Sequence, residues 1–253
     1  WMAMVGYTLQ IYFDFSGYCD MAIGLGLMLG VRLPVNFNSP YRSKSIIEFW
    51  RRWHMTLSAF LRDYVYIPLG GNRGGEIFRL RNIFLTMLIG GIWHGAAWTF
   101  VIWGAIHASL ITANHAARLW LPQLDRMQGP VAGALKQTAL LAAVMIAWVF
   151  FRADGLSAAT AVIGGLVEPA GLFDPDPYVV ALMAFAASLA LFAPNALDVA
   201  GYVEALDQPY PPETPRGARI LRPTPMAAAA TAIMLFAGLA VAWRPAVFIY
   251  YNF

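Results

Sequence analysis

The stretch from Asn82 to His115 reads NIFLTMLIGGIWHGAAWTFVIWGAIHASLITANH and holds three of the chain's four histidines. The rest of it is mostly Leu, Ile, Phe, Trp and Gly, residues suited to the interior of a membrane. An ionisable side chain at membrane depth is costly and is by default a candidate for function. His94, which lies between small residues from Gly90 to Gly95, is therefore the first candidate. The alternative is a neutral imidazole whose hydrogen bonds a neighbouring helix satisfies.

The composition indicates a membrane protein. Of 253 residues, 59% are hydrophobic and 12% charged, whereas roughly a quarter of the residues in soluble domains are charged. The apolar residues come in blocks of about 18–25, enough for a helix to span the bilayer. Backbone in lipid must satisfy its own hydrogen bonds, and no segment alternates as barrel strands do. The sequence therefore predicts an all-α, polytopic membrane protein.

Five apolar segments are predicted spans, with a shorter apolar helix at 156–167. The spans are 2–31, 82–121, 134–151, 177–193 and 226–243. The second is longer than a bilayer requires, so we expect it to bend or break near its glycines. Loops are expected at 122–133 and 194–225, and in the latter Arg216, Arg219 and Arg222 indicate a cytoplasmic side.

The chain is expected to be the C-terminal part of a longer membrane domain. It begins at Trp1, and no short basic and then apolar signal sequence precedes the first span. We therefore treat residues 1–253 as one domain whose N-terminal helices are missing. Asp14 and Asp20, both in the first span, are expected to face protein or a wet cavity, unless they only bond to nearby backbone or arginine.

Residues 32–81 form a basic segment that differs from the spans. They hold nine of the seventeen basic residues: Arg32, Arg42, Lys44, Arg51, Arg52, Arg62, Arg73, Arg79 and Arg81. Such a segment normally lies on the cytoplasmic side and contacts anionic lipid head groups. Ser45 and Glu48 fit a capping box, which predicts a helix that carries the chain through His54. That helix is too charged to span a bilayer, so it should be interfacial or re-entrant.

The sequence lacks the motifs of several other catalytic classes, which leaves catalysis by histidine as the remaining option. The sequence lacks a Gly-rich phosphate motif after a strand, a metal-ligand spacing and a serine-hydrolase motif, and its single cysteine, Cys19, excludes an intrachain disulfide. We predict no metal. His107 lies about 220° around a regular helix from His94, so the two share a face only if the helix breaks between them. His115 is expected to be interfacial.

Several segments together resemble one known family. They are PVNF at 34–37 with PY at 40–41, FWRRWHMTLS at 49–58, RDYVYIPLGGNR at 62–73, GIWHG at 91–95, WGAIH at 103–107 and WVFFR at 148–152. In this order they look like the membrane-bound O-acyltransferase family, in its bacterial alginate O-acetyltransferase branch, which is akin to the teichoic-acid D-alanyl transfer protein. The resemblance is dense over residues 7–152 and looser beyond.

The resemblance implies helices arranged around a central funnel and an enzyme that moves acetyl groups. His94 matches the family's invariant histidine, His54 a second polar position and His107 a histidine of the alginate branch. We expect His94 to act as the base, His54 to orient it or stabilise the oxyanion, and His107 to position substrate or support the pair. Arg51, Arg52, Arg62 and Arg73 are expected to receive acetyl-CoA.

The same resemblance implies a location and partners. The protein is expected in the bacterial inner membrane as a multi-pass protein in contact with lipids. Its acetyl group would pass to an extracytoplasmic transferase protein and then to an exopolysaccharide such as alginate; no nucleic-acid partner is expected.

Two other classes of function stay open. A transporter would use Asp14, Asp20 and the histidines as a path, and it predicts solute flux without consumption of a thioester. A non-catalytic scaffold of a polysaccharide export system predicts that histidine substitutions are silent.

Overall fold

The computed structural model describes residues 1–120, 129–167 and 176–200, with a few isolated positions between 224 and 236. Every regular element within these residues is a helix, so the predicted all-α class is confirmed for them. Most of the predicted 194–225 loop, with Arg216, Arg219 and Arg222, and most of the 226–243 span lie outside the described residues, as do positions 121–128.

Long helices alternate with short ones along the chain. They are α1 (Met2–Met28), η1 (Pro40–Arg42), α2 (Ile46–Arg52), α3 (Met55–Leu61), η2 (Arg62–Tyr66), α4 (Glu76–His94), α5 (Trp98–Trp120), α7 (Pro130–Arg152), α8 (Leu156–Gly165), α9 (Pro177–Phe192) and α10 (Ala196–Ala200). The element η2 is a π-helix. The predicted spans at 2–31, 134–151 and 177–193 and the helix at 156–167 thus correspond to α1, α7, α9 and α8.

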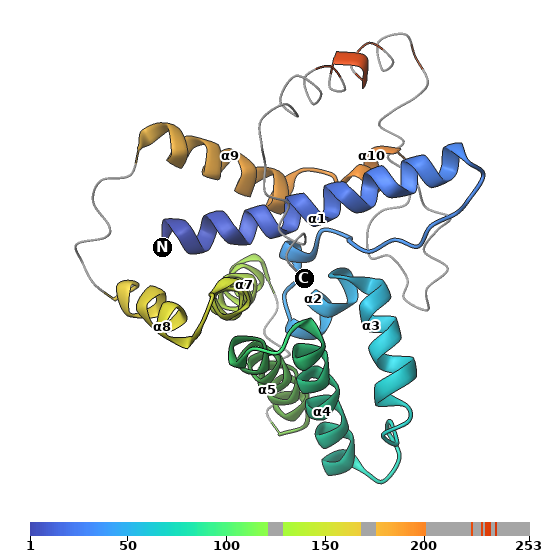
Figure 1. Ribbon diagram of the computed structural model, residues 1–253, viewed down its shortest axis with the longest axis vertical. Helices are drawn as coiled ribbons and strands as arrows, with labels where there is room; N and C mark the ends of the chain where they lie inside the picture. Colours follow the sequence, from blue (N-terminus) through green and yellow to red (C-terminus); the bar gives the residue numbers. More distant parts are fainter. Residues whose placement is uncertain are drawn as a thin grey trace.

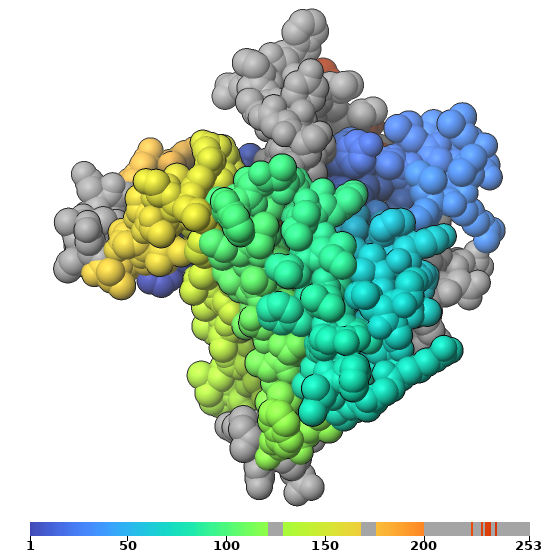
Figure 2. Space-filling view, turned by 60° about the horizontal axis from the view of Figure 1, so that its bottom comes forward, coloured from blue at the N-terminus to red at the C-terminus, as the bar shows by residue number. Residues whose placement is uncertain are grey.

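Helix α7 lies between two groups of helices and packs against both (Figure 1). On one side it packs against α1, along which α9 lies, and on the other against α5, which pairs closely with α4. Figure 2 shows the face on which α3, α4 and α5 lie next to one another, in cyan to green. Among the described helices, α7 is the one long and apolar enough to cross a membrane, and α8 and α9 are shorter apolar helices.

Local sequence signals account for several helix ends. At the end of α1, Gly30 has φ of +75° and Val31 N donates to Gly26 O at 2.7 Å, the glycine-terminated arrangement that satisfies the last carbonyls. Helix α7 begins earlier than predicted, at Pro130, because proline suits the first helical position, where no N–H partner is required.

The predicted break in the 82–121 block is confirmed. Helix α4 ends at His94, Gly95 is its C-cap, and α5 begins at Trp98. The two helices then pack backbone to backbone: a Cβ on Gly91 would lie 2.5 Å from the Phe100 carbonyl oxygen and 2.9 Å from Gly104 Cα. Only residues without a side chain allow so close an approach. The glycines therefore make a tight helical hairpin that carries His94 at its turn.

The predicted helix through His54 is wrong in its length. The capping interaction forms, since Ser45 Oγ accepts from Glu48 N at 3.2 Å. Helix α2 nevertheless ends at Arg52, Trp53 is extended, and His54 has φ of +43° and ψ of +57°. This left-handed conformation costs a non-glycine residue about 1–2 kcal/mol. It lets the chain turn, so His54 stands at a bend between α2 and α3.

Hydrogen bonds from the preceding loop stabilise this bend. Met55 N donates to Asn36 O at 3.1 Å, and Asn38 N donates to Arg52 O at 3.0 Å. The segment 36–38 thus pairs with both sides of the bend, as a neighbouring strand would. These long-range contacts offset the backbone strain at His54, which a helix-capping pattern alone does not reveal.

The core is aromatic and sits where α2, α5 and α7 meet. Phe49, Trp103, His107 and Trp148 are each no more than 2% exposed. The rings of Trp103 and Trp148 stack with centroids 6.0 Å apart, and Trp53 lies 5.0 Å from Trp148. Such pairs add to the burial of apolar area. The core therefore holds the bend after α2 and the turn after α4 against the same ring cluster.

Candidate active site

His54 is half-buried at the bend between α2 and α3. Its Nδ1 atom lies 3.1 Å from Oδ1 of Asn36, and its ring contacts Phe15 edge to face with centroids 4.9 Å apart. Burial and the charge that His94 would carry lower the pKa of His54 to about 4. The imidazole is therefore neutral near pH 7, the form in which it can accept a proton.

His94 is the last residue of α4 and is also half-buried. Its ring meets Trp103 and Phe151 edge to face, with centroids 5.1 Å away in each case. Its ring nitrogens have no hydrogen-bond partner within the described ranges.

His107 lies on α5 and is fully buried. Its Nδ1 accepts a hydrogen bond from Nε1 of Trp50 at 3.3 Å, so in the neutral ring Nε2 carries the hydrogen. That Nε2 has no partner among the residues the structure describes, and the same is true of Nε1 in Trp103 and Trp148.

The structure brings two of the predicted histidines into contact with one ring. Trp103 contacts His94 at 5.1 Å and His107 at 4.9 Å between centroids. The break between α4 and α5 makes this possible, because on one continuous helix the two would point apart. His54 joins them less directly, through Trp53, its neighbour in the chain, whose ring meets Trp148.

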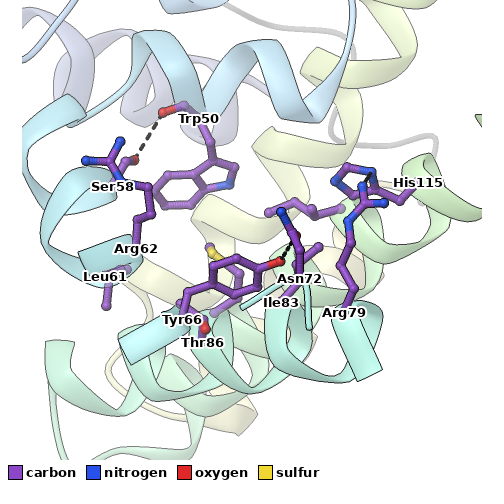
Figure 3. Close-up of a pocket in the computed structure, with 12 residues that line it drawn as sticks. Trp50, Ser58, Leu61, Arg62, Tyr66, Asn72, Arg79, Ile83, Thr86 and His115 are labelled. Atoms are coloured by element: carbon purple, nitrogen blue, oxygen red, sulfur yellow. Dashed lines mark hydrogen bonds between the residues drawn. The ribbon is translucent and has the colours of Figure 1, made fainter. Parts of the chain in front are cut away.

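A cavity of about 340 Å³ lies between α2, α3, η2, α4 and α5, and its lining holds none of the three predicted catalytic histidines. Trp50, Leu61, Ile83, Met87 and Ile111 give it apolar walls, and polar or cationic groups come from Ser58, Arg62, Tyr66, Asn72, Thr86, Arg79 and His115. In Figure 3, Arg62 lies near Ser58 at one end, and Arg79 and His115 lie together at the other. Trp50 lines the cavity and also bonds to His107, so it connects the cavity to the histidines.

The predicted donor-binding arginines separate into two groups. Arg62 lines the cavity and is paired with Asp63, with Nε 2.7 Å from Oδ1. Arg51, Arg52 and Arg73 do not line it; Arg51 and Arg73 are exposed, and Arg52 forms an ion pair with Glu48 at 2.9 Å. Their part in donor binding stays a prediction.

The predicted site lacked Arg79, which lines the cavity, and Asn36, which contacts His54. Arg79 forms an ion pair with Glu76 at 2.8 Å and donates to Nδ1 of His115 at 2.7 Å. The basic segment contained Arg79, but its charge alone could not place it in a cavity. Asn36 was missed for a different reason. It belongs to the PVNF motif at 34–37, but its contact with His54 depends on the fold.

A second cavity, of about 250 Å³, lies between α1 and the α9–α10 region. Asp20 lines it together with Ser16, Ser39, Asn195 and aromatic residues, which agrees with the expectation that this acid faces a cavity or protein. Elsewhere, no group of three His, Cys, Asp or Glu residues within the described ranges is arranged to hold a metal; the absence of a metal stays a prediction.

Comparison with known proteins matches the part of the chain that carries the site. A model of the membrane-bound O-acyltransferase family matches residues 1–152. The chain is 48% identical over 171 residues to a peptidoglycan O-acetyltransferase of Helicobacter pylori, covering 66% of this chain and 31% of that protein. It is 54% identical over 159 residues to a probable alginate O-acetylase of Pseudomonas aeruginosa, covering 63% and 29%.

A more distant relative is a teichoic acid D-alanyltransferase of Bacillus subtilis, 38% identical over 128 residues that cover 46% of this chain and 31% of that protein. The chain thus spans about a third of the length of the curated relatives it matches.

Proposed function

The chain belongs to the membrane-bound O-acyltransferase family, and from that premise we propose that its protein transfers acetyl groups from a cytosolic thioester to an extracytoplasmic acceptor. The donor is acetyl-CoA. The acceptor is a transferase protein that passes the group to an exopolysaccharide of the alginate kind. The protein is a multi-pass protein of the bacterial inner membrane, with its helices around a funnel.

The observation that supports this proposal is the set of imidazoles that Trp50 joins to an apolar cavity with cationic ends. His94 and His107 both contact Trp103, and Trp50 connects His107 to the cavity. His54 stands at the bend next to Trp53, whose ring meets Trp148 of the same cluster. Acyl transfer to a hydroxyl requires both a proton acceptor and a donor for the oxyanion. Two half-buried imidazoles can supply both.

The reaction proceeds by addition and elimination at the thioester. The acceptor's hydroxyl oxygen attacks the carbonyl carbon while one imidazole takes the hydroxyl proton. A second imidazole N–H stabilises the negative charge on the carbonyl oxygen. The C–S bond then breaks, and the thiolate leaves with the proton from the imidazolium. His54 and His94 are the pair that performs these steps. His107 supports them through its contact with the Trp103 ring.

The larger cavity suits the donor. Its apolar walls accommodate a neutral arm, and Arg62 and Arg79 lie at opposite ends, where they can pair with phosphate groups (Figure 3). Each guanidinium already has a carboxylate partner, so a phosphate would compete with or join an existing ion pair. Arg79 and Arg62 are therefore better candidates for donor contact than Arg51, Arg52 or Arg73.

The relatives' names support acetyl transfer to a cell-surface polymer. Two of them are named a peptidoglycan O-acetyltransferase and a probable alginate O-acetylase.

The test uses His94→Ala in the full-length gene. We expect normal abundance in the membrane fraction and loss of O-acetyl groups from the secreted polymer, measured by mass spectrometry against the wild type. Polymer that is still acetylated would remove His94 from the reaction. If all histidine substitutions were silent, the scaffold alternative would hold.

A transporter is the second candidate, because Asp20 lines a cavity of its own. Purified full-length protein in vesicles distinguishes the two: solute flux without release of free CoA supports transport, and CoA release without flux supports acyl transfer.

A further inference from the structure

The side-chain amide of Asn36 makes contacts on both of its ends at the bend between α2 and α3. Its Oδ1 atom lies 3.1 Å from Nδ1 of His54, 3.2 Å from the backbone N of Thr56 and 2.7 Å from Thr56 Oγ1. The side chain is also hydrogen-bonded to Cys19 of α1. One amide thus joins the loop, the first helix and the strained histidine.

The Thr56 backbone determines which end of the amide faces His54. A backbone N–H can only donate, so the Asn36 atom 3.2 Å from it must be the carbonyl oxygen. An amide turned the other way would place two donors against each other. The amide nitrogen then faces the sulfur of Cys19, which can accept.

The orientation of Asn36 in turn determines the tautomer of His54. A carbonyl oxygen can only accept, so the His54 nitrogen 3.1 Å away must carry the hydrogen. In a neutral imidazole with a hydrogen on Nδ1, Nε2 has a free lone pair. In this form His54 can take a proton at Nε2 but cannot donate one to an oxyanion.

We propose that Asn36 is a positioning residue that holds His54 in the Nδ1–H tautomer, so that Nε2 of His54 accepts the proton of the reacting hydroxyl. This inference rests on the proposed acyl transfer, and it reverses the roles expected from the sequence. His94, whose ring nitrogens have no hydrogen-bond partner among the described residues, then supplies the N–H for the oxyanion.

Other contacts at the bend agree with a positioning role. The backbone of the same residue accepts from Met55 N at 3.1 Å, so Asn36 holds both the conformation and the tautomer of the histidine. The titratable groups near the ring are His94 from α4 and Cys19 from α1, which meets the amide nitrogen and not the oxygen. Neither provides an acceptor that could replace Oδ1.

The tautomer can be measured without substrate. Full-length protein with ¹⁵N-labelled histidine is reconstituted in lipid, and the His54 ring signals are identified by their loss in His54→Gln. We expect a protonated Nδ1 and an unprotonated Nε2 near neutral pH. Asn36→Leu should move the hydrogen to Nε2, and Asn36→Asp should keep it on Nδ1, because a carboxylate oxygen also accepts.

Kinetics provide the second readout. Asn36→Leu should lower kcat by about 10- to 100-fold, as is typical when the partner that orients a functional imidazole is lost, with little change in KM for the acetyl donor. Asn36→Asp should recover most of kcat. Its negative charge should also raise the pKa of His54, so the acidic limb of the pH profile should move to higher pH. Ser188→Ala on α9 is the control and should change neither kcat nor the tautomer, because Ser188 is exposed and bonds to Ala184 O within its own helix.

Two results would overturn the inference: Nε2–H as the dominant form in the wild type, or an unchanged tautomer and kcat in Asn36→Leu. If Asn36→Leu does not fold, the His54 ring ¹⁵N signals of the wild type and of Asn36→Asp still show which tautomer is present and so still test the inference. Failure of the proposed function looks different, because wild-type protein would then show the Nδ1–H signals without consuming acetyl-CoA.

Discussion

Trp50 donates its indole N–H to Nδ1 of the fully buried His107 across 3.3 Å, and Trp50 also lines the larger cavity. This bond joins α2 to α5. It also leaves Nε2 of His107 as an N–H inside the ring cluster, against Trp103.

Trp50→Phe removes the donor while keeping an aromatic ring. Nδ1 of His107 would then be a buried acceptor without a partner, which costs about 1–3 kcal/mol. We expect a lower thermal unfolding temperature in detergent and reduced acetyl transfer. Trp98→Phe is the control, since Trp98 is 73% exposed and should leave stability unchanged. Equal stability of Trp50→Phe and the wild type would show that the bond contributes little.

Gly91→Ala tests the close approach of α4 and α5. The new methyl group would lie 2.5 Å from the Phe100 carbonyl oxygen, so the helices must separate, at a cost of about 1–3 kcal/mol. Because His94 follows on the same helix, activity should fall with stability. Gly24→Ala in α1 has open space around the new methyl group and should be neutral or stabilising. A fully stable Gly91→Ala variant would contradict the hairpin packing.

Arg79→Gln tests the cationic end of the cavity. Loss of a charged partner for phosphate should raise KM for acetyl-CoA by about tenfold, with a smaller change in kcat. Arg73→Gln is the matched control, because Arg73 is exposed on the loop and does not line the cavity. Equal effects of the two substitutions on KM would indicate general electrostatic attraction and not a site at Arg79.

Stability should fall on acidification because of His54. Folding lowers the pKa of His54 from its ordinary 6.5 to about 4. Between these two values the unfolded chain binds a proton that the folded protein does not, so the free energy of unfolding decreases as the pH is lowered through this window. Unfolding temperatures measured from pH 7 to 4 should show this slope, and His54→Gln should reduce it. An unchanged slope in His54→Gln would exclude His54 as its cause.

Much of the architecture follows from local pattern. Apolar block length predicted α1, α7, α8 and α9, because burial of long apolar segments favours a helix whatever its neighbours. The glycines from Gly90 to Gly95 predicted the break after α4 for the same local reason. The prediction of a helix that continues through His54 was wrong. Ser45 and Glu48 show where a helix begins, but they do not show that the loop at 36–38 bonds to the backbone at its end.

By itself, the sequence determined the helical class and the break that makes the hairpin carrying His94, and it identified three histidines as candidate catalytic residues. Apolar blocks, glycines and side-chain chemistry act over a few residues, so a local pattern is enough to show them. Only the tertiary structure decided which groups meet: Trp103 between His94 and His107, Arg79 in place of Arg73 at the cavity, and Asn36 against His54. These contacts join residues from different helices and loops. Their geometry depends on packing across the aromatic core, which no local pattern encodes.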